Sequence, residues 1–277
     1  MEQVLNFNNP NIQIFLVPVI LSFITTGLLR LSFGAWKGAL LSAYGIGVGY
    51  IASYCLLRGF FIWPTIDALS ILPIIIISGF IIGPVIDYFD FGEDIKTPIF
   101  VSFTLGIIYW VAGGNQGMAL DTEGSIFYGL LIIGGIWVFQ RLEKNKDDCI
   151  ASPISCFSAL LGLAIIGMLS GSDLGLHAMA FTSAIFGFLL WNWPRCRYPW
   201  STTGSIISAS GFLVLAILLV HEQPNLAFPV GFIFLTFLIY EISSRVFPSS
   251  QTTQPIIQLL SAGIPIAVSG FLVFFGV

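Results

Sequence analysis

Four carboxylates within eight residues form the stretch of this sequence best suited to chemistry: Asp87, Asp90, Glu93 and Asp94. Carboxylate oxygens are preferred ligands of Mg²⁺, and a bound Mg²⁺ can hold the oxygens of a diphosphate. One hypothesis for the protein is therefore a lipid-active transferase that uses Asp87, Asp90 and Asp94 together with Mg²⁺. The alternative is a solvated acidic loop without a ligand.

The spacing of Asp87, Asp90 and Asp94 is similar to the DxxDxxxD motif of the membrane prenyltransferase family that contains UbiA. The resemblance implies prenyl transfer with Mg²⁺ held by these three aspartates. It extends over about eight residues, and Ile86 stands where the family has asparagine. The run also follows the third apolar segment instead of the second, and the later half contains no second aspartate motif. The solvated loop is therefore our leading interpretation of the run.

Small and polar residues inside two apolar segments suggest a different chemistry, the passage of a solute. The residues are Ser78, Gly79, Ser208, Ser210 and Gly211. Interrupted helices in the two halves of a transporter expose backbone groups to a cavity near the membrane midplane. We expect a substrate site at these five residues, and ordinary serine-mediated packing is the alternative. A permease for a small or amphipathic solute, without a cofactor and without enzymatic activity, is the leading functional hypothesis.

Aromatic and basic residues alternate in the segment from Trp191 to Trp200, which contains Arg195 and Arg197. Guanidinium groups bind phosphates and carboxylates through paired hydrogen bonds. We expect Arg195 and Arg197 to contact a lipid headgroup or an anion. An interfacial anchor is the alternative, because aromatic rings and arginines both favour the headgroup layer.

The composition requires a membrane to position these residues. Of the 277 residues, 56% are hydrophobic and 9% are charged, and the mean hydropathy is +0.95. Soluble domains carry about 25% charged residues. The chain is therefore an all-α polytopic membrane protein whose main partner is the lipid bilayer, and nucleic acid is not an expected partner.

About ten apolar segments are long enough to cross a bilayer, which takes about 20 apolar residues in a helix. The expected spans are 11–29, 38–57, 70–88, 98–114, 124–140, 152–170, 174–193, 203–220, 226–244 and 255–276. Nine of the ten Lys and Arg residues fall on one side of this arrangement, and Arg58 alone on the other. Basic residues are retained in the cytoplasm, so both termini are predicted outside a plasma membrane or bacterial inner membrane.

Residues 141–150 carry six charges between Arg141 and Asp148 and form a cytoplasmic connector between a first five-helix half, 1–140, and a second, 151–277. An odd number of spans per half would invert one half relative to the other. Paired features at offsets of 130 to 132 residues support such a repeat, for example Trp63-Pro64 with Trp193-Pro194. Chance is the alternative, because the residue types involved are common in this chain.

A third hypothesis is a non-catalytic membrane subunit that binds partners through small-residue helix faces. Such a face occurs at Gly45, Gly47 and Gly49, where backbones can approach closely. The four cysteines form no CxxC pair, and three of them fall at ends assigned to the cytoplasm. Since thiols stay reduced there, we expect no structural disulfide.

Overall fold

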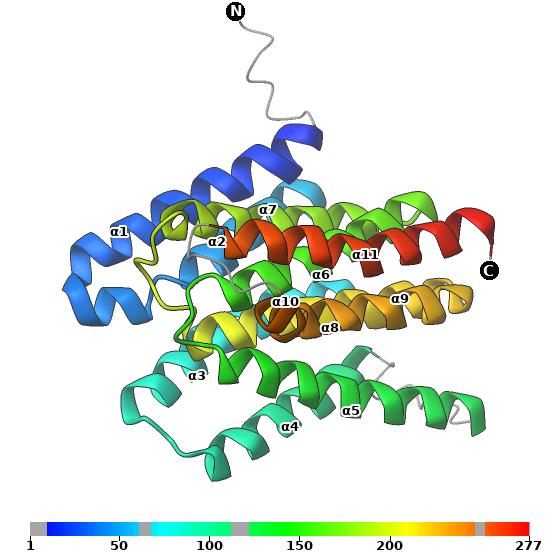
Figure 1. The fold of residues 1–277 in the computed structure, drawn as a ribbon, viewed down its shortest axis with the longest axis horizontal. Helices are drawn as coiled ribbons and strands as arrows, with labels where there is room; N and C mark the ends of the chain where they lie inside the picture. Colours follow the sequence, from blue (N-terminus) through cyan, green and yellow to red (C-terminus); the bar gives the residue numbers. More distant parts are fainter. Residues whose placement is uncertain (1–9, 61–67, 112–121, 247–252, 277) are drawn as a thin grey trace, which may run out of the picture.

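The computed structural model describes residues 10–60, 68–111, 122–246 and 253–276, and within these ranges the protein is built of helices without strands (Figure 1). The helices are α1 (Val17–Leu40), α2 (Tyr44–Arg58), α3 (Ile71–Phe89), α4 (Glu93–Val111), α5 (Thr122–Lys144), α6 (Ala151–Leu169), α7 (Leu174–Asn192), α8 (Ser201–Glu222), α9 (Ala227–Ile233), α10 (Ile239–Val246) and α11 (Gln254–Phe275).

Eight helical segments among the described residues are long and apolar enough to cross a membrane. The all-α, multi-pass membrane class is thereby confirmed, whereas the count of ten spans is not. The expected second and fifth spans correspond to α2 and α5, which are not among the eight. With 15 residues, α2 extends over about 22 Å, less than the roughly 30 Å of hydrocarbon in a typical bilayer.

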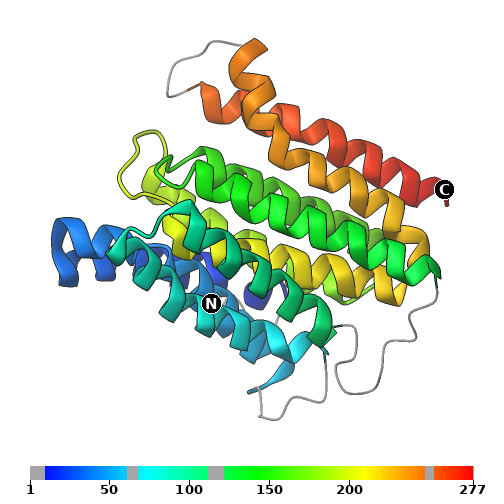
Figure 2. The ribbon, with the colours of Figure 1, turned by 90° about the horizontal axis from the view of Figure 1, so that it is seen from below.

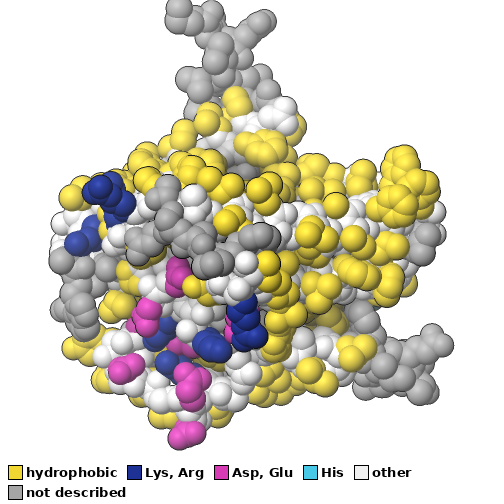
Figure 3. Space-filling view, in the orientation of Figure 1, with side chains coloured by type: hydrophobic (Ala, Val, Ile, Leu, Met, Phe, Trp, Pro, Cys, Tyr) yellow, Lys and Arg dark blue, Asp and Glu magenta, His cyan; other side chains and the backbone are white. Residues whose placement is uncertain are grey.

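Helix α8 lies at the centre of the molecule (Figures 1 and 2). All of its residues from Ser201 to Val220 are buried, against α3, α4 and α5 on one side and α6 and α7 on another. The outer helices instead expose apolar side chains, such as Leu31 of α1 and Leu260 of α11. Figure 3 shows charged side chains gathered at one end of the molecule and apolar side chains over much of the rest. This distribution fits a bilayer around the apolar part.

The expected ninth span is interrupted. Its first part is α9, its middle is a 3₁₀-helix from Phe234 to Leu238, and its last part is α10. A 3₁₀ stretch inside a longer helix tightens the turn and changes the direction of the hydrogen bonds. The two ends of this span therefore pack differently. Helix α9 packs against α11 and α6, whereas α10 packs chiefly against α11.

The residues expected to line a solute site lie where helices pack closely. Ser208 and Ser210 are fully buried. A Cβ atom added at Gly79 would lie 3.1 Å from a side-chain carbon of Ile207, and one added at Gly211 would lie 2.5 Å from the ring of Phe181. The Ser78 hydroxyl donates to the Ile75 carbonyl of its own helix. These contacts are those of close helix packing, the alternative interpretation, and the substrate site at the five residues stays a prediction.

The small-residue face of α2 is also used inside the chain. A Cβ atom at Gly45 would lie 2.5 Å from the Ser22 carbonyl oxygen, and one at Gly49 would lie 2.6 Å from the Pro18 carbonyl oxygen. Both carbonyls belong to α1. Glycine therefore permits the close approach of α1 and α2 at this face.

The expectation that no disulfide forms was wrong. Cys149 and Cys196 are joined by a disulfide, with their Cα atoms 5.6 Å apart, while Cys55 and Cys156 are free. The bond links the connector to the segment between α7 and α8. Sequence spacing did not indicate the pair because 47 residues separate the two cysteines, and the folded helices bring the two segments together.

The division into two inverted five-helix halves stays a prediction. Trp63-Pro64, one of its supporting features, lies outside the described residues. The buried helix α8 belongs to the second half and contacts α3, α4 and α5 of the first. The two predicted halves therefore share one core.

Replacing Gly83 by alanine tests the contact between α3 and α8. A Cβ atom there would lie 2.5 Å from the Thr203 Cα atom, so the backbones must move apart, at a cost of about 1–3 kcal/mol. We expect Gly83→Ala to lower the thermal unfolding midpoint in detergent or nanodiscs. Gly106→Ala is the matched control, because nothing lies within 4 Å of its added methyl group. Equal midpoints for the two variants would contradict the packing described here.

Replacing Cys149 by serine tests the disulfide. A crosslink that closes a loop of this length typically stabilises a protein by about 2–4 kcal/mol. We expect Cys149→Ser, and wild-type protein treated with a reductant, to unfold at a similarly lowered midpoint. Cys55→Ser removes a free thiol and should leave the effect of the reductant unchanged. A wild-type midpoint that is insensitive to the reductant would count against the bond.

Candidate functional site

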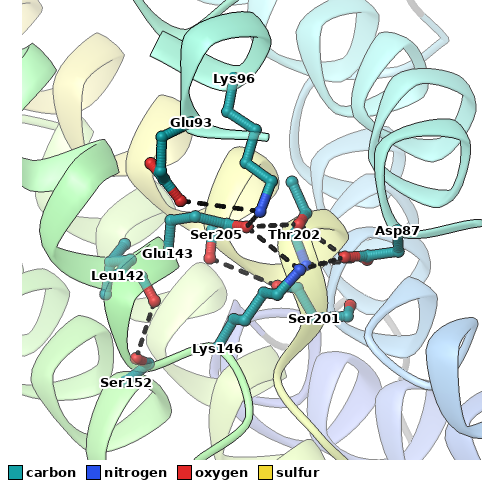
Figure 4. Close-up of polar contacts among 10 residues, drawn as sticks. All are labelled: Asp87, Glu93, Lys96, Leu142, Glu143, Lys146, Ser152, Ser201, Thr202 and Ser205. Carbon is teal, nitrogen blue, oxygen red and sulfur yellow. Dashed lines mark hydrogen bonds and ion pairs between the residues drawn. The ribbon is translucent and has the colours of Figure 1, made fainter. Parts of the chain in front are cut away.

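Four charged side chains meet at the N-terminus of α8 (Figure 4). Asp87 comes from the last turn of α3, Lys96 from the first turns of α4, Glu143 from the last turn of α5 and Lys146 from the connector. Thr202 of α8 lies between them. We call these five residues the polar cluster. Three stretches that are far apart in the sequence, 87–96, 143–146 and the start of α8, therefore contribute to one site.

Asp87 uses both carboxylate oxygens within the cluster. Its Oδ2 accepts a hydrogen bond of 2.9 Å from the Thr202 backbone N–H. Its Oδ1 lies 2.6 Å from the Thr202 hydroxyl oxygen and 3.0 Å from the Lys146 Nζ. The unpaired N–H groups and the dipole at a helix N-terminus favour a negative charge at this position. Asp87 therefore caps α8 from another helix.

Glu143 links the two lysines. Its Oε1 lies 3.1 Å from the Lys96 Nζ and 3.3 Å from the Lys146 Nζ, and 2.9 Å from the Thr202 hydroxyl oxygen. Its Oε2 is buried without a hydrogen-bond partner in the structure. All the interactions of Glu143 within the cluster thus converge on one oxygen.

The cluster is buried and formally neutral. The side chains of Asp87 and Glu143 are both 3% exposed, that of Lys96 is 7% exposed and that of Lys146 is 18% exposed. Two cations balance two anions, as burial of charge requires. Burial alone would lower the pKa of Lys146, but attraction by Glu143 and Asp87 outweighs it and the pKa is raised above its usual range. Lys146 is therefore held in its charged form.

The local backbone brings the connector to α8. Ser201 begins α8 with a φ of 63°, a left-handed conformation that costs free energy for a residue with a side chain. Its N–H donates to the Lys146 carbonyl at 3.1 Å. This bond and the nearby disulfide both join the connector to the segment that leads into α8. They place the Lys146 side chain beside Thr202.

Of the three aspartates predicted to bind a metal, Asp87 alone lies in the cluster. Asp90 and Asp94 are exposed. Asp90 ends α3 with a φ of 46°, so the chain turns there and the carboxylates that follow do not share the direction of Asp87. Within the described ranges, the structure contains no group of three or more His, Cys, Asp or Glu residues that could hold a metal ion.

The cluster does not fit Mg²⁺. This ion requires oxygen ligands in near-octahedral geometry, but both oxygens of Asp87 already accept hydrogen bonds. Ammonium groups occupy the space beside Glu143 Oε1, and they would repel a dication. We therefore derive no chemical step through a metal at this site.

Arg195 and Arg197 lie in the segment between α7 and α8, and both are exposed. The Arg197 backbone N–H donates to the Asn192 side chain at 3.1 Å, which ties the segment to the end of α7. Neither arginine is part of the polar cluster. Their contact with a headgroup or an anion stays a prediction.

Sequence reasoning missed Lys96, Glu143, Lys146 and Thr202. The only signal was the density of charges in the connector, which was used to predict orientation. A buried role could not be inferred, because Lys146 and Asp87 are 59 residues apart and Thr202 and Asp87 are 115 residues apart. The contacts depend on which helix ends meet in the folded protein.

Two pockets are formed by helices and segments that also contribute to the cluster, the connector and α5. A pocket of about 890 Å³ is lined by connector residues, including Asp148, and by Tyr240, Ser244 and Gln258 of α10 and α11. An apolar groove of about 650 Å³ lies between α5 and α9, with Trp137 and Phe234 among its walls. Toward the charged end, Arg141 Nε joins α5 to the 3₁₀ stretch that follows α9 by donating to the Phe237 carbonyl at 3.2 Å. Arg141 also forms an ion pair with Glu241.

These features define the class: an integral, multi-pass membrane protein with a buried polar cluster at one end of its helices. No protein-family model matches the chain. It is similar to the phospho-N-acetylmuramoyl-pentapeptide-transferase of Streptomyces griseus, with 30% identity over 134 residues, which cover 47% of this chain and 35% of that protein. The protein of the same name from Streptomyces avermitilis is 28% identical over 134 residues, which cover 46% of this chain and 34% of that protein.

The chain thus matches about a third of the length of these relatives. The similarity and the eight apolar helices together support an integral bacterial membrane protein. They favour the transferase hypothesis over the permease hypothesis, because both relatives are transferases by name.

Replacing Glu143 by glutamine tests the cluster as a stabilising unit. The change leaves two buried ammonium groups with Asp87 as their remaining anion in the cluster, and breaking a buried ion pair typically costs about 3–5 kcal/mol. We expect a clear loss of thermal stability. Glu93→Gln is the control: its carboxylate is 74% exposed and 3.8 Å from Lys96, so the change should cost at most about 1 kcal/mol. Similar losses for both variants would contradict a buried network.

The raised pKa of Lys146 predicts a pH dependence. Its stabilising effect is fully present below the ordinary lysine pKa of about 10.4 and is lost as the pH rises through the higher pKa of the folded state. The difference in unfolding midpoint between wild type and Lys146→Gln should therefore stay constant from neutral pH up to the ordinary lysine pKa. It should shrink at higher pH. Lys144→Gln, at a side chain that is 68% exposed, is the control. A difference that already declines near pH 8 would contradict the assignment.

Proposed function

We propose that the protein is a membrane transferase that moves a phosphorylated sugar group onto a lipid phosphate. The observation that carries the proposal is the 134-residue similarity to a phospho-N-acetylmuramoyl-pentapeptide-transferase. The relative's name supplies the class of the transferred group. The membrane-embedded fold supports a lipid as the acceptor.

The apolar groove between α5 and α9 supports a lipid acceptor. Its residues are Leu, Ile, Val, Ala, Phe, Trp and Gly, without a charged side chain. A groove of this kind can hold the hydrocarbon chain of an acyl or prenyl lipid by burying apolar surface. The polar cluster and the groove share helix α5: Glu143 lies in its last turn and Trp137 two turns earlier. A lipid in the groove would have its headgroup directed toward the charged end.

The polar cluster supports binding of the phosphates. Lys146 is its most exposed member, and the two carboxylates lie deeper. An approaching phosphate would therefore meet an ammonium group before a carboxylate. Lysine is a common phosphate ligand that acts as a point charge. The pocket beside the connector offers polar side chains and enough volume for part of a sugar or peptide group.

The proposed reaction is a phosphoryl-group exchange. An oxygen of the lipid phosphate attacks the phosphorus attached to the sugar of a nucleoside-diphosphate donor. A new P–O–P bond forms, the bond between the two donor phosphorus centres breaks at its bridging oxygen, and nucleoside monophosphate leaves with that oxygen. The lysines contribute by positioning the phosphates and by stabilising the negative charge that develops in the transition state.

A transfer assay tests the proposal. Purified protein in nanodiscs that contain a polyprenyl phosphate is incubated with a nucleoside-diphosphate-linked N-acetylmuramoyl-pentapeptide, and the lipid product is measured by mass spectrometry. We expect a lipid-linked product that grows with time and depends on the protein.

Lys96→Gln should lower the rate about 100-fold, the typical effect of removing one electrostatic contact to the reacting group. Lys144→Gln removes a charge that is paired with Glu241 at the surface and should leave the rate unchanged. Absence of product with this donor and with other nucleoside-diphosphate sugars would overturn the transferase proposal.

A further inference from the structure

We infer that the polar cluster works without a divalent cation, and that the ammonium groups of Lys96 and Lys146 supply the positive charge that a metal ion would otherwise bring to the substrate phosphates. This inference deepens the proposed function and, for its catalytic part, rests on it. It assigns to two lysines a role that the transferase hypothesis gave to Asp87, Asp90 and Asp94 with Mg²⁺.

Both carboxylate oxygens of Asp87 are already held by donors within the cluster. Thr202 occupies both of its carboxylate oxygens, through the backbone N–H at 2.9 Å and the hydroxyl at 2.6 Å. Lys146 Nζ adds a third contact at 3.0 Å. A metal ion at Asp87 would have to displace the capping interaction that begins the most buried helix of the protein.

The carboxylate of Glu143 is also poorly suited to bind a metal ion. The ammonium groups of Lys96 and Lys146 lie within 3.3 Å of its Oε1, and the Thr202 hydroxyl oxygen, whose single proton also faces Asp87, lies 2.9 Å away. Its Oε2 is without a partner, and one oxygen is too few for an ion that needs several. The two ammonium groups lie next to that carboxylate and would repel a dication at close range.

The formal charge of the cluster is balanced without a metal ion. Burial of two carboxylates requires positive charge nearby, and the two lysines provide it inside the protein. In a cluster that relies on a metal, the carboxylates would instead have excess negative charge before the metal binds. Here the formal charge is already zero, so a dication would bring an excess of two positive charges into a buried site.

The two lysines are positioned so that they can still act on a substrate. Lys146 is 18% exposed and Lys96 is 7% exposed, while both carboxylates are 3% exposed. The cationic groups therefore lie closer to the surface than the anionic ones. Lysine, arginine and Mg²⁺ are alternative means of stabilising a phosphoryl group in its transition state, so ammonium groups in this position can perform that role.

Metal binding can be measured without any activity. Metal-stripped protein in nanodiscs of uncharged lipid is titrated with Mn²⁺ up to about 1 mM, the weak end of protein sites for divalent cations, and bound Mn²⁺ is followed by electron paramagnetic resonance. We expect wild type, Asp87→Asn and Glu143→Gln to give the same weak, non-saturating signal. A stoichiometric Mn²⁺ site that is lost in Asp87→Asn or Glu143→Gln would overturn the inference.

The transfer assay gives the second readout. In the presence of EDTA we expect the wild-type rate to be unchanged, and Lys96→Gln and Lys146→Gln to be slower by about 100-fold each. Glu93→Gln and Asp94→Asn, at exposed carboxylates of the acidic run, serve as controls that should retain the rate. A rate that is abolished by EDTA and restored by Mg²⁺ would also overturn the inference. If no product forms under either condition, the proposed function fails, whereas the Mn²⁺ titration still tests the metal site by itself.

Discussion

The structure depends on the neutralisation of buried charge at the N-terminus of α8. This helix is buried from Ser201 to Val220, so the free N–H groups at its N-terminus must be satisfied by protein atoms. Asp87 does this from α3, and its own charge then has to be balanced. Lys146 and, through Glu143, Lys96 complete the balance. One requirement, the capping of a buried helix, thereby determines how the ends of α3, α4 and α5 and the connector are arranged.

Most of the fold could be predicted from the sequence because the bilayer restricts the choices. An apolar segment in lipid has to satisfy its own backbone hydrogen bonds, and a helix is the simplest way to do so. Within the described residues, all ten apolar segments overlap helical parts of the structure, the ninth with α9, the 3₁₀ stretch and α10 together. The length of α2 and the 3₁₀ break between α9 and α10 could not be predicted, because both depend on packing against neighbours and not on local hydrophobicity.

The candidate site was predictable only in part. Asp87 was singled out for its carboxylate and its position at the end of an apolar segment, and it does lie in the polar cluster. Its partners could not be identified, because the cluster is assembled from segments that meet only after the helices have packed. The same reason explains the disulfide between Cys149 and Cys196. The expectation that the Ser-Gly pairs line a cavity stays a prediction; in the folded protein Gly79 and Gly211 lie close to Ile207 and Phe181.

The interrupted ninth span has a mechanical consequence. Its first part contributes Phe228 and Val230 to the apolar groove, and its last part contributes Tyr240 and Ser244 to the polar pocket. The 3₁₀ stretch between them is joined to α5 by the hydrogen bond from Arg141. This contact is a point about which α10 can pivot. A tilt of α10 about this point would change the widths of the groove and of the pocket together. Occupancy of the two spaces would then be thermodynamically linked, so that filling one alters the affinity of the other by the same factor in both directions.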